Sequence, residues 1–123
     1  MKEVLLDTNF ILSCIRNKID FFEELNLMGF KILIPKQVVF ELASILDSKK
    51  KLKFKEEASL ALQLLKNNSF KEVDLGVSYV DEGIRKFSKN NKDVIVATLD
   101  KELKDELMNS KLVIRNKKSL EVI

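Results

Sequence analysis

Short apolar runs alternate with longer stretches of helical period along almost the whole chain, and this alternation limits the fold more than any other feature. Runs rich in Val, Ile and Leu are typical of strands, and apolar residues spaced three or four apart are typical of helices. The predicted strands cover residues 3–6, 31–35, 70–75, 93–98 and 111–115, and the predicted helices cover residues 9–15, 20–29, 36–46, 56–68, 78–90 and 100–110. Alternating strands and helices predict a three-layer α/β sandwich, with helices on both faces of a mainly parallel sheet.

The length of 123 residues suits a single domain, residues 1–123, with a core of its own. We find no internal repeat, low-complexity tract or domain linker in the sequence. Only three Gly and one Pro are present, which argues against an all-β architecture with many turns. Residues 47–55, "DSKKKLKFK", form a basic connection between two helical patterns.

The composition excludes several kinds of chemistry. No histidine is present, so Ser-His-Asp and Cys-His catalysis, paired-histidine RNA cleavage and His-ligated zinc are excluded. The single cysteine, Cys14, cannot form an intramolecular disulfide, and we predict a small core residue in a cytoplasmic protein. No apolar run approaches the roughly 20 residues of a membrane span, and the N-terminus lacks a signal-peptide pattern. A formal net charge of +3 is a mild preference for polyanions.

Asp7 and Asp100 occupy equivalent places, each just after a predicted strand and just before a predicted helix. The carboxyl ends of parallel strands lie at one edge of a sheet, where such folds bind ligands. The two carboxylates therefore face one another if their strands are neighbours. The alternative is that each aspartate only caps the helix that follows it.

Two further acids stand out. Glu41 lies in the apolar segment "VVFELASIL", on the same helical stripe as Val38 and Ile45. We predict that it points into a crevice at the same edge of the sheet, and the alternative is a charge that reaches water from the edge of the stripe. Asp81 opens a predicted helix and is the weakest candidate, with Glu82 or Asp74 as alternatives.

Clustered carboxylates repel one another unless one takes up a proton or a cation joins them. An oxygen-only ligand set suits Mg²⁺ or Mn²⁺ rather than zinc. Mg²⁺ commonly binds one or two carboxylates together with substrate phosphates, so a phosphodiester is the logical substrate. No Gly-rich phosphate loop follows the first strand, which disfavours a nucleotide-binding domain.

Four motifs in this order resemble those of the PIN-domain family of metal-dependent ribonucleases, over essentially the whole chain. They are "LLDTNFIL" with Asp7, Thr8 and Asn9, "IPKQVVFEL" with Glu41, "VDEGI" with Asp81, and "IVATLDKELKDEL" with Thr98 and Asp100. The resemblance implies a five-stranded parallel sheet and an acidic pocket in which Asp7, Glu41, Asp81 and Asp100 bind Mg²⁺ or Mn²⁺. Thr8, Asn9 and Thr98 are the implied supporting residues.

Within that family, the third and fourth motifs look most like the branch of small-subunit ribosomal RNA processing factors. Members of that branch often carry two adjacent aspartates in the third motif, and Glu82 stands at the second position here. The family's other large branch comprises toxins of toxin–antitoxin pairs. The metal count, one or two, stays open at this point.

The residues predict a phosphodiester as substrate, and together with the resemblance they imply an endoribonuclease that hydrolyses RNA phosphodiester bonds. Lys101 and Lys104, and the lysines of residues 47–55, are candidate contacts to RNA phosphates, with a solvated surface as the alternative. The chain has no Trp and one Tyr, Tyr79, which predicts binding dominated by phosphates. The alternatives are an RNA-binding ribosome-assembly factor without catalysis, and a toxin ribonuclease. The corresponding partners are a pre-rRNA complex or an antitoxin protein, and the apolar helices at 20–29 and 56–67 suggest a homodimer face.

Overall fold

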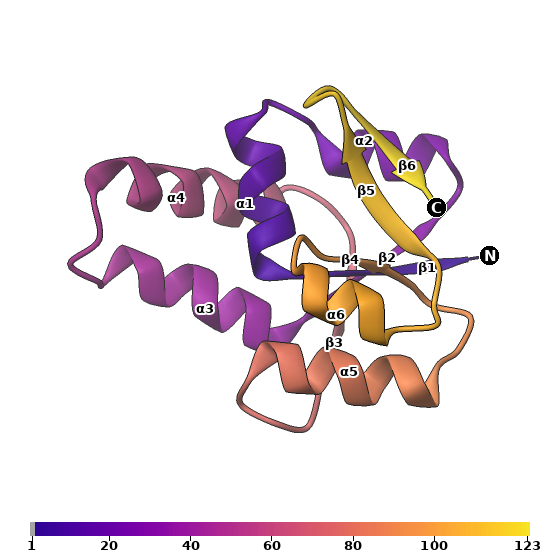
Figure 1. Cartoon of the computed structure of the whole chain (residues 1–123). Helices are drawn as coiled ribbons and strands as arrows, with labels where there is room; N and C mark the ends of the chain where they lie inside the picture. Colours follow the sequence, from indigo (N-terminus) through magenta and orange to yellow (C-terminus); the bar gives the residue numbers. More distant parts are fainter. Residues whose placement is uncertain (1) are drawn as a thin grey trace.

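A mixed sheet with helices on both faces forms the centre of the computed structural model, which describes residues 2–123 (Figure 1). The strands are β1 (Glu3–Leu6), β2 (Lys31–Pro35), β3 (Lys71–Val73), β4 (Ile95–Ala97), β5 (Lys111–Arg115) and β6 (Ser119–Val122). The helices are α1 (Thr8–Arg16), α2 (Phe21–Leu27), α3 (Lys36–Leu46), α4 (Leu52–Lys66), α5 (Val80–Asn90) and α6 (Lys101–Glu106). The predicted α/β sandwich is confirmed.

The strand order is β3-β2-β1-β4-β5-β6, and all neighbours are parallel except β5 and β6. The sheet therefore has one strand more than the five that were predicted. The added strand β6 folds back on β5 through Asn116 and Lys117, whose φ angles are +53° and +58°. Asn116 is a typical residue for a left-handed turn position, but Lys117 is not, so the sequence carries only half of a hairpin signal there.

Helix α3 spans the predicted residues 36–46, and α1, α2 and α5 differ from their predicted bounds by at most two residues at either end. Helix α6 ends at Glu106, four residues before the predicted end, because Leu107 has an extended backbone. Helix α4 begins at Leu52, four residues before the predicted start, so the basic connection is limited to residues 47–51. Lysine and leucine are good helix formers, which explains why the helix extends into the lysine-rich segment. Arg16 of α1 pairs with the buried Glu57 of α4, with 2.8 Å between Nη2 and Oε1, and joins these two helices.

The core is built around β1, β2 and β4, whose apolar side chains are almost completely buried. Cys14 is a free, buried thiol, as predicted. The apolar residues that suggested a dimer face mostly contribute to this core: Phe21, Phe22, Leu25, Ala58, Ala61 and Leu65 are all buried. Of the helices in residues 2–123, none combines the length and the apolar character that crossing a membrane requires.

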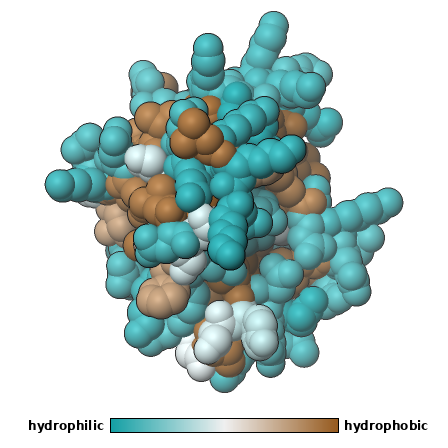
Figure 2. Space-filling model, turned by 90° about the vertical axis from the view of Figure 1, so that its left-hand side faces the viewer, coloured by the Kyte–Doolittle hydropathy of each residue, from teal (hydrophilic) through white to brown (hydrophobic). Residues whose placement is uncertain are grey.

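The parallel strands run from right to left in Figure 1 and end on the side where α1, α3, α5 and α6 begin. Figure 2 shows this side from the front, and hydrophobic side chains reach the surface there between hydrophilic ones. The exposed apolar residues of the α3–α4 pair include Phe40, Leu52 and Leu60. The edge that carries the strand ends is therefore not a uniformly charged surface.

Candidate active site

The site lies where the sheet reverses its winding direction, between β1 and β4. From β1 the chain continues to β2 and β3 on one side, whereas β4 and β5 lie on the other, and Leu6 pairs in register with Ala97. Asp7 follows β1 directly, and its backbone N–H donates to the carbonyl oxygen of Ala97 at 3.0 Å. A reversal of this kind opens a crevice at the carboxyl ends of the strands, where α/β sheets bind ligands.

Asp7 is a buried carboxylate with only 5% of its surface exposed, and it forms no ion pair with any residue in the range 2–123. Its Oδ1 accepts from the backbone N–H of Thr8 at 2.7 Å, and its Oδ2 accepts from the hydroxyl of Thr98 at 2.8 Å. The pKa of Asp7 is raised to about 6, chiefly by burial and also by the charges of Asp81 and Glu41, against the lowering effect of these two hydrogen bonds. Asp7 is thus a helix cap and also a carboxylate that is costly to ionise.

Thr98 connects Asp7 to Asp100. Its fully buried hydroxyl donates to Asp7 and accepts from the backbone N–H of Asp100 at 3.2 Å. The carboxylate of Asp100 caps α6 by accepting from the backbone N–H of Leu103 at 3.1 Å. Each aspartate therefore does cap its helix, and the same threonine fixes the orientation of both strand ends.

Glu41 reaches the site from α3 through Thr8. The hydroxyl of Thr8 donates to the carboxylate of Glu41, although the two residues are 33 positions apart in the sequence. Val38 and Leu42 carry the buried stripe of α3, while Glu41 lies at its exposed edge. Glu41 consequently has water on one side and Thr8, the neighbour of Asp7, on the other.

Asp81 lies in the first turn of α5 and faces Asp100. The two carboxyl groups are within hydrogen-bonding reach, and partial burial, the charge of Asp100 and this contact all raise the pKa of Asp81, while Arg85 lowers it. Gly83 lets this turn pack closely, because a Cβ at Gly83 would lie 2.6 Å from the Cβ of Leu75. The missing side chain thus holds the start of α5 close to the strand ends.

The two alternatives to Asp81 have other surroundings. Asp74 accepts from the side-chain amide of Gln37 at 2.8 Å and from the ammonium of Lys36 at 3.1 Å. These contacts and the backbone N–H of Gly76 lower the pKa of Asp74 to about 2. Glu82 is exposed on α5. Among the described residues, Asp81 and Glu41 are the acids whose charges act on Asp7.

The remaining candidates lie around this cluster. Asn9 is exposed in the first turn of α1, and its side chain makes no hydrogen bond within residues 2–123. Lys101 is exposed at the start of α6. Lys104, one turn later, lines a hollow of about 340 Å³ together with Thr98 and Lys117.

The carboxylate oxygens of these acids are suitable ligands for a hard divalent cation, but the side chains do not supply a complete coordination shell. In the part of the chain that the structure describes, no three Asp, Glu or Cys side chains are grouped closely enough to hold a metal ion. They form two linked pairs instead, Asp7 with Glu41 through Thr8, and Asp81 with Asp100 directly. Mg²⁺ commonly takes one or two carboxylates and completes its shell with water and substrate phosphates, so a full protein cage is not required.

Sequence reasoning did not find the residues beside Glu41 that line a hollow with it, including Lys36, Gln37 and Phe40. The ties of Gln37 to Asp74 and Leu75 join segments distant in sequence and leave no local pattern. Phe40 did carry a signal. It lies two residues from both Val38 and Leu42, so helical spacing directs it away from the buried stripe.

The chain is similar to known proteins over nearly its full length. A family model described as "PIN like domain" matches residues 4–117. Ribonuclease VapC4 of Methanocaldococcus jannaschii is 38% identical over 128 residues, which cover 99% of this chain and 97% of that protein. A solved structure of the PIN domain endonuclease Utp24 matches with a TM-score of 0.79 and 27% identity, over 98% of this chain and 90% of that one.

Proposed function

Since the chain belongs to the PIN-like domain family, we propose that it is a metal-dependent endoribonuclease that hydrolyses RNA phosphodiester bonds. Two similarities support this activity: the relative from M. jannaschii is named a ribonuclease, and the similar solved structure is titled an endonuclease. The observation that carries the proposal is the buried carboxylate of Asp7, whose charged neighbours among the described residues are two acids, Asp81 and Glu41. Such an arrangement is tolerable at neutral pH when a divalent ion joins the acids.

In this proposal Asp7, Glu41, Asp81 and Asp100 hold Mg²⁺ or Mn²⁺. When bound, the ion neutralises charge on the phosphate oxygens and lowers the pKa of a coordinated water. Asp7 acts in its ionised form, and the hydrogen bonds from Thr98 and from the backbone of Thr8 fix the direction of its two oxygens. The hydroxyl of Thr8 fixes Glu41 in the same way. Asn9 is kept as a supporting candidate on the exposed face of the same helix turn.

The Asp81–Asp100 pair makes metal binding sensitive to pH. Partial burial, the charge of Asp100 and the contact between the two carboxyl groups raise the pKa of Asp81, so an added positive charge is favourable here. A divalent ion held by these residues would compete with protons for the same oxygens. Metal affinity should therefore fall with decreasing pH.

RNA is the proposed partner, with Lys101 and Lys104 in contact with backbone phosphates on the α6 side of the crevice. Ribosomal RNA processing and toxin activity are two settings for the same chemistry, with a pre-rRNA complex or an antitoxin protein as further partner. Growth arrest on expression of the active chain, absent for an Asp7→Asn variant, would favour the toxin setting. The homodimer stays a prediction.

The direct test is RNA cleavage with Mg²⁺, with Mn²⁺ and with EDTA, for the wild type and for Asp7→Asn. We expect cleavage only with a divalent ion, and a loss on the order of a hundredfold or more for Asp7→Asn, because the variant lacks a metal-binding charge. Asp20→Asn is the matched control. Asp20 also caps a helix, α2, by accepting from the backbone N–H of Glu23 at 3.1 Å, but it is exposed and belongs to another part of the fold.

Cleavage by Asp20→Asn at the wild-type rate would separate the metal role of Asp7 from helix capping. Wild-type cleavage in EDTA, or full activity of Asp7→Asn with an unchanged fold, would contradict the proposal. RNA binding without any cleavage would favour the RNA-binding assembly factor instead.

A further inference from the structure

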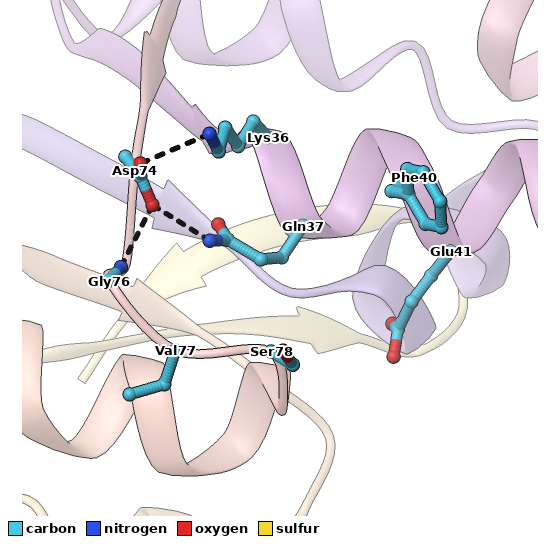
Figure 3. A pocket seen from close by; sticks show the side chains of 8 residues that line it. All are labelled: Lys36, Gln37, Phe40, Glu41, Asp74, Gly76, Val77 and Ser78. Atoms are coloured by element: carbon cyan, nitrogen blue, oxygen red, sulfur yellow. Dashed lines mark hydrogen bonds and ion pairs between the residues drawn. The ribbon is translucent and has the colours of Figure 1, made fainter.

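A hollow of about 670 Å³ adjoins, on the side of α3, the two linked acid pairs Asp7–Glu41 and Asp81–Asp100, together called the acid cluster below (Figure 3). It lies between the beginning of α3 and residues 74–78, and Glu41 belongs both to its lining and to the acid cluster through Thr8. The volume falls within the range of small-ligand sites. Anything bound in the hollow therefore lies next to the proposed cleavage site.

The floor of the hollow is fixed by hydrogen bonds that leave Gln37 a single orientation. Its amide nitrogen donates to Asp74 at 2.8 Å, and its amide oxygen accepts from the backbone N–H of Leu75 at 3.2 Å. Asp74 also accepts from the backbone N–H of Gly76 at 2.9 Å, as Figure 3 shows. A site whose polar groups are already held in place loses little conformational entropy on binding.

Phe40 supplies an open aromatic face at this hollow. The residue is 75% exposed, and it precedes Glu41 directly on α3. Val77 adds apolar surface from the facing segment. An exposed aromatic ring at the mouth of a preformed hollow suits a flat ligand that can stack on it.

The charges of the hollow disfavour a phosphate. Glu41 and Asp74 both line it, and the ammonium of Lys36 is already paired with Asp74. A phosphate group would meet two carboxylates and no free cation in this lining. An uncharged planar group that can donate hydrogen bonds to a carboxylate is the better match, and a nucleobase has these properties.

We propose that this hollow binds one nucleobase of the RNA, stacked on Phe40, beside the phosphate that is cleaved at the acid cluster. The inference rests on the proposed function and adds to it a contact that reads a base. The sequence indicated no aromatic stacking residue and predicted RNA binding dominated by phosphate contacts. The proposal adds a base contact, through Phe40, to that prediction.

The test combines Phe40 variants with an RNA that is cleaved at one bond and carries a single abasic nucleotide at each position in turn. For wild-type protein, one abasic position near the cleaved bond should lower kcat/KM by about fivefold to a hundredfold, the usual range for loss of one stacked base. Phe40→Ala should lower kcat/KM on the intact RNA by a similar factor. At that same position the abasic nucleotide should then cause no further loss in Phe40→Ala, because the two changes remove one contact.

Two variants make the result specific. Phe40→Tyr keeps an aromatic face and should stay within about twofold of the wild type. Leu27→Ala is the control for loss of an exposed apolar side chain, because Leu27 is 81% exposed at the end of α2 and does not line the hollow. It should leave both the activity and the abasic profile unchanged.

Two results would overturn the inference and leave the nuclease proposal in place. One is that the losses in kcat/KM from Phe40→Ala and from the abasic nucleotide add at every position. The other is full activity of Phe40→Ala on the intact RNA. If the wild type shows no metal-dependent cleavage, the nuclease proposal fails. The affinities of wild type and Phe40→Ala for the same series of abasic RNAs then test the inference. It holds if one abasic position weakens binding to the wild type but causes no further loss in Phe40→Ala.

Discussion

Asp7 and Asp74 occupy equivalent positions in the fold and have opposite electrostatics. Each is the first residue after a parallel strand, β1 or β3, at the same edge of one sheet. The pKa of Asp7 is raised to about 6, chiefly by burial, whereas that of Asp74 is lowered to about 2 by hydrogen bonds from Gln37, Gly76 and Lys36. The position at the end of a strand therefore does not determine how a carboxylate behaves.

The difference lies in burial and in the groups that stabilise the ionised form. Asp74 is exposed, and its ionised form is stabilised by hydrogen bonds from Gln37 and Gly76 and by the ammonium of Lys36 at 3.1 Å. Within residues 2–123, the carboxylate of Asp7 accepts hydrogen bonds from one hydroxyl and one backbone N–H, and its charged neighbours are acids. Burial of a carboxylate in this way favours binding of a cation from outside the chain, which is the role that the proposed metal ion would have.

The difference between Asp7 and Asp74 predicts its largest effect for Asp7→Asn, which should be more stable than the wild type when both are measured in EDTA. The rise in the pKa of Asp7 from 3.8 to about 6 means that its ionised form costs the folded state about 3 kcal/mol. The folded state binds the proton more tightly than the unfolded state, so wild-type stability from this group is present below about pH 4 and is lost as the pH rises through about 6. Asp7→Asn should remove this loss, and chemical unfolding at pH 4 to pH 8 measures it.

The quantity to compare is the difference in unfolding free energy between Asp7→Asn and the wild type at each pH. It should grow by about 2.4 kcal/mol between pH 4, where Asp7 of the unfolded chain is already about half ionised, and pH 7, and then level off. Asp20→Asn, which changes an exposed cap, should show no such pH dependence. A loss of stability for Asp7→Asn at every pH would instead mean that Asp7 serves mainly as the cap of α1.

A smaller effect is expected when the hydroxyl of Thr98 is removed. Thr98→Val deprives Asp7 of the hydrogen bond that most lowers its pKa, and it leaves the backbone N–H of Asp100 without this acceptor. The unfolding free energy at neutral pH should fall by about 1–2 kcal/mol, and the pH midpoint assigned to Asp7 should move upward. The same unfolding series measures both changes.

Thr98→Ser keeps the hydroxyl and is the matched control, so it should restore the wild-type midpoint. An unchanged midpoint in Thr98→Val would show that burial alone sets the pKa of Asp7. The contrast with Asp74 would then owe nothing to Thr98.

Much of the fold could be predicted from local patterns. Strand β2 and helix α3 have the bounds predicted from apolar spacing, because residues that alternate or recur every three to four positions report which face is buried. Strand β6 was missed because its turn uses Lys117 at a positive φ, where the sequence carries no typical turn residue. The early start of α4 was missed because lysines suit both a helix and an exposed connection.

In the candidate site, too, one part could be predicted from the sequence and another could not. Asp7 and Asp100 could be assigned to one edge of the sheet because parallel strands share their direction, and β1 and β4 are neighbours. The links that join the acids could not be predicted, since Thr8 reaches Glu41 across 33 residues and Thr98 reaches Asp7 across 91. Such contacts depend on side-chain directions that only the assembled fold determines.

The smallest effect concerns Asp74, and its sign should be opposite to that of Asp7. A lowered pKa means that the folded state favours the ionised form, so this contribution to stability is present above about pH 4 and is lost as the pH falls through about 2. Asp74→Asn should therefore lower the melting temperature slightly at pH 7. Because the Lys36–Asp74 pair is exposed, salt should reduce the change.

Measured side by side at pH 7 in EDTA, the two substitutions should move the melting temperature in opposite directions, upward for Asp7→Asn and slightly downward for Asp74→Asn. Lys36→Gln is the matched control on the other side of the exposed pair, and it should reproduce the small loss without affecting the pH profile of Asp7. If both aspartate variants were stabilised, the cation of Lys36 would not compensate Asp74. The proposed difference between Asp74, which pairs with a lysine of the chain, and Asp7, which would bind a metal ion, would then have to be abandoned.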